Sequence, residues 1–257
     1  MKNINGYENE FEFVKYLNKR KIKHLNPMFK ELIVGLFGRV DEEDTILSWR
    51  NHLPQKTDVF AKINGVLKGI SIKKGMKNSV HVDGISQFIH FLIENRVPRN
   101  IIIEYLKYHY ADGSTNGKGS KRISVTEYKI YNQKSIDEIN RYFNQENLLD
   151  KAIDRFVLKG NNSNYYIDVL IYGEVNDFIW IMKKDIKQII MSKKDEYSSS
   201  VHFGSLTCQP KNRCLNYNSL YEKDRYCVQI KWYNINDEII EFMNNNLQLS
   251  FGVSSME

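Results

Sequence analysis

The sequence of 257 residues has an ordinary globular composition, with 42% hydrophobic and 26% charged residues, which excludes a wholly disordered chain. This length suits one large domain or two small ones that share a core. The sequence has no uninterrupted apolar stretch of about 18 residues and no apolar segment of a signal peptide near Met1, so we expect a cytoplasmic protein without a membrane segment. Three cysteines fit a reducing compartment better than a disulfide scaffold. The net charge of +6 permits an anionic partner such as nucleic acid.

The first third of the chain combines helical patterns with one strong hairpin signal. Apolar residues recur at helical spacing in 8–20 and 26–38. Two alternating runs follow, joined by Asn64-Gly65. Asn-Gly between alternating runs predicts a tight β-hairpin over residues 57–73. The segment 83–95 then carries one apolar helical face.

The rest of the chain predicts a mixture of helices and strands. Residues 99–110 read as a strand and 122–131 as its return strand, with a glycine-rich segment between them. The pattern is helical over 135–158, and strands then alternate with helices that begin near Asp185 and Asp237. We therefore expect a mixed α/β chain. The polar segment GNNSN predicts a loop that permits a domain boundary near residue 160, and nothing in the sequence requires independent domains.

The predicted hairpin gathers polar side chains on one face. Side chains alternate between the two faces of a strand, so Asp58 faces away from Val59, and Ser71 and Lys73 face away from Ile72. Pairing through a tight turn would bring Asp58 close to Ser71 and Lys73. Another carboxylate, Asp83, is expected at the start of the next helix, ten residues after Lys73.

A carboxylate beside an ammonium group is what a metal-dependent phosphodiesterase requires. Mg²⁺ prefers oxygen ligands and is usually held by one or two carboxylates, water and phosphate. The metal polarises the phosphate and lowers the pKa of bound water, and a neighbouring lysine can orient that water and offset charge on phosphorus. We expect Asp58 and Asp83 to bind Mg²⁺, Lys73 to assist the attacking water, and Ser71 to hold a water or a metal-bound ligand.

The motif formed by Thr57-Asp58, twelve intervening residues and Ser71-Ile72-Lys73 resembles that of the PD-(D/E)xK nucleases, particularly the small type II restriction endonucleases. The resemblance covers roughly residues 6–95, and the segment 205–232 is similar, more weakly, to strands that follow the core in these enzymes. It implies an α/β restriction-endonuclease-like fold with a mixed β-sheet flanked by helices and a C-terminal α+β DNA-recognition part. Residues 1–160 would then form the nuclease core and 161–257 the DNA-recognition part, with the two parts separate or continuous.

The sequence departs from the family pattern at two positions. Thr57 replaces the family's proline, and Ser71 replaces the second acid, two residues before the lysine. The resemblance offers two substitutes for the missing carboxylate, Asp83 from the following helix and Glu10 from the first helix. Asp83 could equally be a helix N-cap or first-turn residue, and Glu10 could equally be an exposed helix residue.

The DNA contacts that we predict come from three regions. Between residues 56 and 77 the basic residues outnumber Asp58, the only acid, by six to one, which would attract a polyanion. The glycine-rich segment 111–122 could lie along a phosphate backbone or form a flexible hairpin tip. Polar residues near the C-terminus are of the types that read base edges. The predicted contacts are Lys74, Lys77, Lys118, Lys121, Arg122, Gln209, Lys211, Asn212, Arg213, Gln229 and Lys231.

The expected function is Mg²⁺-dependent hydrolysis of double-stranded DNA at a short specific sequence, by a monomer or a homodimer. The resemblance implies 5′-phosphate and 3′-hydroxyl ends and a partner methyltransferase that protects the host. Two alternatives stay open. One is a structure-directed or repair nuclease with the same core. The other is a DNA-binding protein whose catalytic site has decayed, which the serine at position 71 permits.

Overall fold

The computed structural model describes residues 6–74, 78–161, 165–211 and 219–253. The chain divides into two compact units that interleave along the sequence. Unit 1 comprises Met1–Asn78, Val157–Ile189 and Asn234–Glu257, and unit 2 comprises Ser79–Phe156 and Ile190–Tyr233. This division differs from the single boundary expected near residue 160, because each unit is assembled from separate stretches of chain.

Unit 1 is built on a mixed six-stranded sheet with the order β1-β2-β3-β4-β6-β7. Neighbouring strands are antiparallel except β4 and β6, which are parallel. The strands are β1 (Arg20–Lys21), β2 (Thr45–Arg50), β3 (Val59–Ile63), β4 (Val66–Lys73), β6 (Val169–Glu174) and β7 (Asp177–Met182). A parallel pair needs a long crossover connection, and here the chain between β4 and β6 contains the first stretch of unit 2. The parallel pairing therefore joins segments of unit 1 that lie on either side of this stretch of unit 2.

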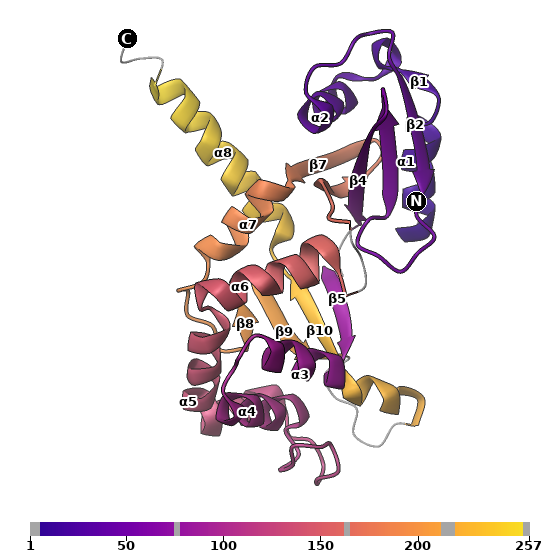
Figure 1. The fold of residues 1–257 in the computed structure, drawn as a ribbon. Coiled ribbons are helices and arrows are strands. Elements are labelled where there is room, and N and C mark those ends of the chain that lie inside the picture. Colours follow the sequence, from indigo (N-terminus) through magenta and orange to yellow (C-terminus); the bar gives the residue numbers. More distant parts are fainter. Residues whose placement is uncertain (1–5, 75–77, 162–164, 212–218, 254–257) are drawn as a thin grey trace. The chain divides into compact units, whose positions relative to one another are not determined.

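Two helices cover one face of this sheet (Figure 1). They are α1 (Gly6–Leu17) and α2 (Pro27–Phe37), and the short helix η1 (Ile22–His24) connects them. Phe13 of α1, Phe29 of α2 and Phe178 of β7 meet in a cluster with ring centroids 4.9–5.8 Å apart. This aromatic packing, together with alternate aliphatic residues of β3 and β4, fixes α1 against the hairpin.

The hairpin predicted from the Asn-Gly signal is confirmed. β3 and β4 pair from Val59 opposite Ile70 to Ile63 opposite Val66. Asn64 and Gly65 form the turn with φ values of 47° and 86°, the positive values that a tight hairpin turn needs at both central residues.

Unit 2 contains an antiparallel sheet in the order β5-β10-β9-β8 and a group of helices. Its strands are β5 (Ser79–Gly84), β8 (His202–Phe203), β9 (Leu206–Pro210) and β10 (Cys227–Trp232). Its helices are α3 (Ile85–Glu94), α4 (Arg99–Tyr110), α5 (Val125–Phe143) and α6 (Glu146–Ile153), with the short helix η3 (Ser219–Tyr226) before β10. In Figure 1, α3 and α6 cross in front of the strands. Phe143 and Phe203 stack with centroids 4.4 Å apart in the core beneath them.

Three further elements adjoin the boundaries between the units in the sequence. They are η2 (Asp154–Lys159), α7 (Lys183–Ser192) and α8 (Ile235–Val253). The helices expected near Asp185 and Asp237 are therefore present. Among the described residues, no helix combines the length and the apolar character that crossing a membrane requires.

The two strands predicted at 99–110 and 122–131 are wrong, because the first segment forms α4 and most of the second lies in α5. In α4, Ile101, Tyr105 and Tyr108 recur at helical spacing and are buried, so tertiary packing overrides the strand preference of a run rich in isoleucine and tyrosine. In α5, the Ser124 side chain accepts a hydrogen bond from the backbone N–H of Glu127. The spacing Ser-x-x-Glu is the capping signal that the strand interpretation overlooked.

Candidate active site

The hairpin brings Asp58, Ser71 and Lys73 together, as its predicted register requires. Asp58 immediately precedes β3, and its backbone N–H donates to the carbonyl of Ile70 at 2.9 Å. Asp58 Oδ2 lies 3.0 Å from Ser71 Oγ and 3.3 Å from Lys73 Nζ. It also accepts a hydrogen bond from the backbone N–H of Ile72 at 2.6 Å. The acid and the amine are therefore in direct contact.

The hydrogen bonds of Asp58 are arranged asymmetrically. All three donors contact Oδ2, and within the described part of the chain no donor contacts Oδ1. The side chain of Asp58 is 18% exposed and that of Lys73 is 26% exposed. The carboxylate is thus held in one orientation while part of the group stays accessible. A carboxylate in this state can bind a cation through its second oxygen.

Ser71 contacts Asp58 directly, and its expected role of holding a water or a metal-bound ligand stays a prediction. Its side chain is buried, and its hydroxyl donates to Asp58. The contact orients the Asp58 carboxylate. Ser71 therefore orients the carboxylate of Asp58, and its hydroxyl does not supply a second acid.

Glu10 lies close enough to Asp58 for the two carboxylates to repel each other. It lies on α1, one turn before the buried Phe13, and its side chain is 20% exposed. Burial raises the pKa of Glu10, and the nearby charge of Asp58 raises it further, whereas Arg50 and Lys73 oppose the shift. The interpretation of Glu10 as a simple exposed residue therefore does not describe its environment.

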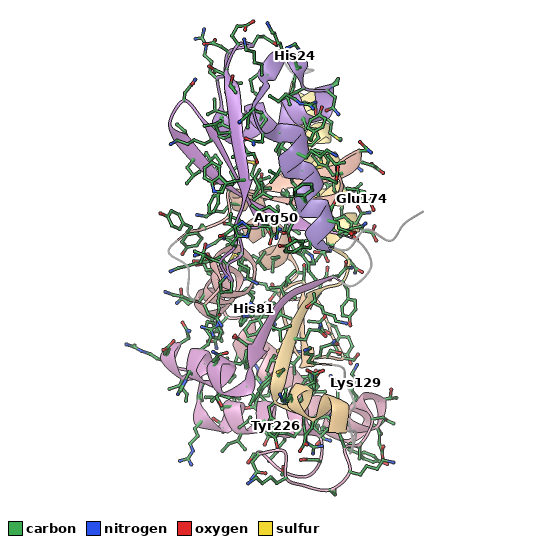
Figure 2. The ribbon with its side chains drawn as sticks, turned by 90° about the vertical axis from the view of Figure 1, so that its right-hand side faces the viewer. His24, Arg50, His81, Lys129, Glu174 and Tyr226 are labelled. Atoms are coloured by element: carbon green, nitrogen blue, oxygen red, sulfur yellow. The ribbon has the colours of Figure 1, made fainter. Side chains whose placement is uncertain are left out.

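Sequence reasoning did not identify Arg50, which contacts Glu10 from β2. Arg50 Nε lies 3.1 Å from Glu10 Oε2, and the arginine side chain is 12% exposed (Arg50 is labelled in Figure 2). No local pattern points to this residue, because it precedes Asp58 by eight positions and meets Glu10 across 40 residues of sequence. Only the packing of α1 against the sheet creates the pair.

The residues of this site fit a divalent cation. Asp58 and Glu10 supply hard carboxylate oxygens, and their mutual repulsion is a charge arrangement that a bound cation relieves. Among the described residues, no group of three or more His, Cys, Asp or Glu side chains is placed to hold a metal. Two carboxylates completed by water and phosphate are nevertheless the usual protein contribution to a Mg²⁺ site.

Asp83 differs from its expected position and environment. It lies in β5 and not at the start of a helix, and it belongs to unit 2, whereas Asp58 and Lys73 belong to unit 1. Its side chain has no exposed surface, Oδ2 lies 2.9 Å from Arg155 Nη2, and Oδ1 lies 3.1 Å from His81 Nε2. The expected pairing of Asp58 and Asp83 is therefore not formed within either unit, and the contacts of Asp83 are those of a structural carboxylate.

The excess of lysine around the hairpin is partly neutralised by acids from elsewhere in unit 1. Lys68 Nζ lies 3.2 Å from Asp168 Oδ1, which immediately precedes β6. Lys74 Nζ lies 2.8 Å from Oε1 of Glu174 at the end of β6 (Glu174 is labelled in Figure 2). Lys77 lies outside the described residues. The parallel pairing of β4 with β6 thus supplies acids that a sequence window around the hairpin does not contain.

The glycine-rich segment 111–122 forms a structured loop between α4 and α5. The buried Asp112 accepts hydrogen bonds from the backbone N–H groups of Ser114 and Gly119, at 2.9 and 3.1 Å, and from the side chain of Arg225. Lys118 and Lys121 are exposed and remain candidate phosphate contacts.

Arg122, which was predicted to contact DNA, is not exposed on this loop. It is buried, and its guanidinium donates to the carbonyl of His109. It therefore belongs to the interior of unit 2 and not to the exposed surface of the loop.

The candidate base-reading residues form a hydrogen-bonded row on the sheet of unit 2. Gln209 and Gln229 are directly opposite each other in β9 and β10, and Gln209 Nε2 donates to Gln229 Oε1 at 3.2 Å. Gln229 Nε2 in turn donates to Ser79 Oγ of β5 at 3.1 Å. Gln209 is buried, which leaves Gln229 and Lys231, both on one face of β10, as the partly exposed members.

Two more predicted contacts come from the segment that follows β9. Lys211 Nζ lies 2.8 Å from Asp224 Oδ1. Asn212 and Arg213 lie outside the described residues.

A solved structure is similar to this chain over most of its length. No protein-family model matches the chain, and no curated protein matches it at a significant level. Among solved structures, the chain is similar to the restriction endonuclease MspI in complex with its cognate DNA, with a TM-score of 0.56 and 14% sequence identity. The match covers 90% of this chain and 93% of that chain. The expected fold class is therefore confirmed: the chain has a restriction-endonuclease-like fold, a mixed β-sheet flanked by helices.

Proposed function

We propose that this protein is a type II restriction endonuclease, which hydrolyses phosphodiester bonds of double-stranded DNA at a short specific sequence and depends on Mg²⁺. The observation that carries the proposal is the contact between Asp58 and Lys73 of the hairpin, at 3.3 Å. A second carboxylate, Glu10 of α1, lies near Asp58. The fold supports it, since the similar MspI structure contains cognate DNA. Double-stranded DNA is accordingly the proposed partner.

Each residue of the site has a defined task in this proposal. Asp58 and Glu10 would hold Mg²⁺, which when bound polarises the scissile phosphate and lowers the pKa of water. Ser71 and the backbone N–H of Ile72 hold the Asp58 carboxylate through Oδ2. Its Oδ1 could then bind the metal without a change in the side-chain orientation. Lys73 donates hydrogen bonds to the attacking water and offsets the negative charge that develops on the phosphate oxygens.

Unit 2 would supply contacts to DNA. The exposed Lys118 and Lys121 suit phosphate contacts, which give affinity without sequence information. Gln229 carries an amide, the group that pairs with adenine, and Lys231 carries an amine, which pairs with guanine. Both are partly exposed on one face of β10. Sequence reading by this face is part of the proposal.

A digestion of plasmid DNA of known sequence tests the catalytic assignment. Wild-type protein with Mg²⁺ should give discrete fragments, whose ends can be mapped, and EDTA should stop the reaction. Lys73→Ala should reduce the cleavage rate by at least about 100-fold, because the amine acts on the developing charge. Lys62→Ala is the matched control, since Lys62 lies on β3 of the same hairpin outside the Asp58 contact. Undiminished cleavage by Lys73→Ala would refute the assignment.

The position of Ser71 supports a second candidate function, sequence-specific DNA binding without cleavage. Ser71 occupies the place of an acid, and its buried hydroxyl serves only to orient Asp58. A protein of this kind would bind a defined DNA site and leave it intact at every Mg²⁺ concentration. Gel-shift selection of the bound sequence, followed by incubation of that DNA with Mg²⁺, separates the two functions. A requirement for branched DNA in the same assay would instead indicate a structure-directed nuclease.

A further inference from the structure

We propose that Arg50 is a positioning residue of the candidate active site, which holds the Glu10 carboxylate where it can share a divalent cation with Asp58. This inference rests on the proposed function, because it assigns Arg50 a task in the same metal site. It extends that function to a residue outside the nuclease motif.

The register of the sheet places the backbone of Arg50 next to the Asp58 position. Arg50 is the last residue of β2 and pairs with Val59, the residue that follows Asp58. The next backbone N–H, that of Asn51, donates to the carbonyl of Asp58 at 2.9 Å. The Asp58 backbone is therefore hydrogen-bonded on both sides, to the residue that follows β2 and to Ile70 of β4. The end of β2 is therefore held beside the Asp58 backbone, and from there the Arg50 side chain reaches Glu10.

Contacts with α1 hold the guanidinium in one orientation. Its Nε lies 3.1 Å from Glu10 Oε2, and its Cζ lies 3.4 Å from the centroid of the Tyr7 ring. Tyr7 and Glu10 are three residues apart on a helix and therefore share one face of it. The ring thus supports the flat face of the guanidinium while an edge binds the carboxylate. A planar group stacked in this way cannot be replaced equivalently by the amine of lysine.

The helix itself does not depend on Arg50 for its position. Asn9 Nδ2 donates to the carbonyl of Gly173 at 2.9 Å, and Phe13 and Leu17 are buried in the core of unit 1. Removal of the guanidinium should therefore leave α1 in place. It would free the Glu10 side chain, which the negative charge of Asp58 repels. Partners that orient a metal-binding carboxylate in this way typically contribute a factor of about 10–100 to metal affinity or activity.

A metal-binding experiment with the full chain tests this role. Calorimetric titration of Ca²⁺ into the complex with duplex DNA should show about tenfold weaker binding for Arg50→Met than for wild type. The Mg²⁺ concentration needed for half-maximal cleavage should rise by a similar factor, and DNA affinity in EDTA should change less than about twofold. The matched control is Arg20→Met, since Arg20 also stacks on a tyrosine, with Cζ 4.0 Å from the Tyr16 ring centroid.

A double-mutant cycle with Glu10→Gln decides whether Arg50 acts through Glu10. If it does, Arg50→Met should have almost no further effect on Ca²⁺ binding in the Glu10→Gln background. An equal loss in both backgrounds, or Ca²⁺ binding by Arg50→Met that matches Arg20→Met, would overturn the inference. Arg50→Lys should bind Ca²⁺ with intermediate affinity, and it replaces Arg50→Met in the cycle if the methionine variant does not fold. A wild-type protein that binds Ca²⁺ with this dependence but does not cleave DNA would support the positioning role and overturn the proposed catalysis.

Discussion

Asp58 in unit 1 and Asp83 in unit 2 have similar sequence surroundings and opposite environments. Asp58 immediately precedes the alternating strand β3, Asp83 lies in β5 next to its last residue, and each was expected to bind the same metal. Asp58 keeps 18% of its side chain exposed and has another carboxylate, Glu10, nearby. Asp83 has no exposed side-chain surface and lies between Arg155 and His81 (His81 is labelled in Figure 2). A partly exposed acid beside a second acid suits a cation, whereas a fully buried acid that is paired with an arginine contributes to the stability of its unit.

The same contrast extends to other buried polar groups of unit 2. Asp112 organises the loop after α4, and the buried His109 bonds to the carbonyl of Arg225 at 2.9 Å. In unit 1, by comparison, the group around Asp58 combines partial exposure with two neighbouring carboxylates, Asp58 and Glu10. Four predictions test whether the group around Asp58 carries out the chemistry and whether the buried polar groups of unit 2 contribute to stability.

The largest effect should come from Asp58→Asn. The amide keeps the size of the side chain but removes the charge that would hold Mg²⁺, so the cleavage rate should fall by about 1000-fold. Thermal unfolding should be little changed, because the amide oxygen can still accept from Ser71 and Ile72. Fragment formation from labelled duplex DNA and a melting curve measure the two quantities. A variant that cleaves normally would remove Asp58 from the site.

Asp83→Ala should act on stability. Removal of the buried carboxylate leaves Arg155 without its partner, and we expect a loss of roughly 3 kcal/mol in the free energy of unfolding. Urea denaturation followed by circular dichroism measures this loss. The folded fraction of the variant should cleave DNA at the wild-type rate. A variant of unchanged stability that has lost Mg²⁺-dependent cleavage would restore Asp83 as a metal ligand and erase the contrast.

His109 should make the protein sensitive to mild acid. Burial lowers the pKa of His109 from 6.5 to about 4, so the folded state holds the neutral ring, whereas the unfolded chain binds a proton below about pH 6.5. The contribution to stability is complete above pH 6.5 and is lost as the pH falls toward 4. Between pH 7.5 and pH 5 it amounts to about 2 kcal/mol. Urea unfolding at pH 7.5 and at pH 5 should show this difference in the free energy of unfolding for wild type and a smaller difference for His109→Gln. An equal difference in the two proteins would assign the acid sensitivity to another group.

The smallest effects should come from the exposed loop lysines. Lys118→Ala and Lys121→Ala should each weaken DNA binding only a few-fold and lower the slope of log K against log salt by about 0.9, because each removes one phosphate contact. Fluorescence anisotropy in EDTA at several salt concentrations measures both. Slopes identical to wild type would show that this loop does not contact DNA. Arg122→Ala would be an unsuitable member of this series, because Arg122 is buried.

The sequence alone determined the parts of the site that depend on local geometry. Alternating runs joined by Asn64-Gly65 specify the hairpin register, and register alone places Asp58 next to Ser71 and Lys73. The helical spacing in 8–20 likewise gave α1, the element that carries Glu10. These features follow from repeats of two and about 3.6 residues, which the chain displays without reference to distant segments.

Only the tertiary structure decided which distant segments meet. The parallel pairing of β4 with β6 interleaves the two units and brings Asp168 and Glu174 to the hairpin lysines. Packing of α1 on the sheet joins Arg50 to Glu10, and the interior of unit 2 encloses Asp83 and turns residues 99–110 into a helix. Such contacts depend on burial and charge pairing across many residues of chain. Local propensity does not predict these contacts, because the apolar face of one segment can pack against more than one partner surface.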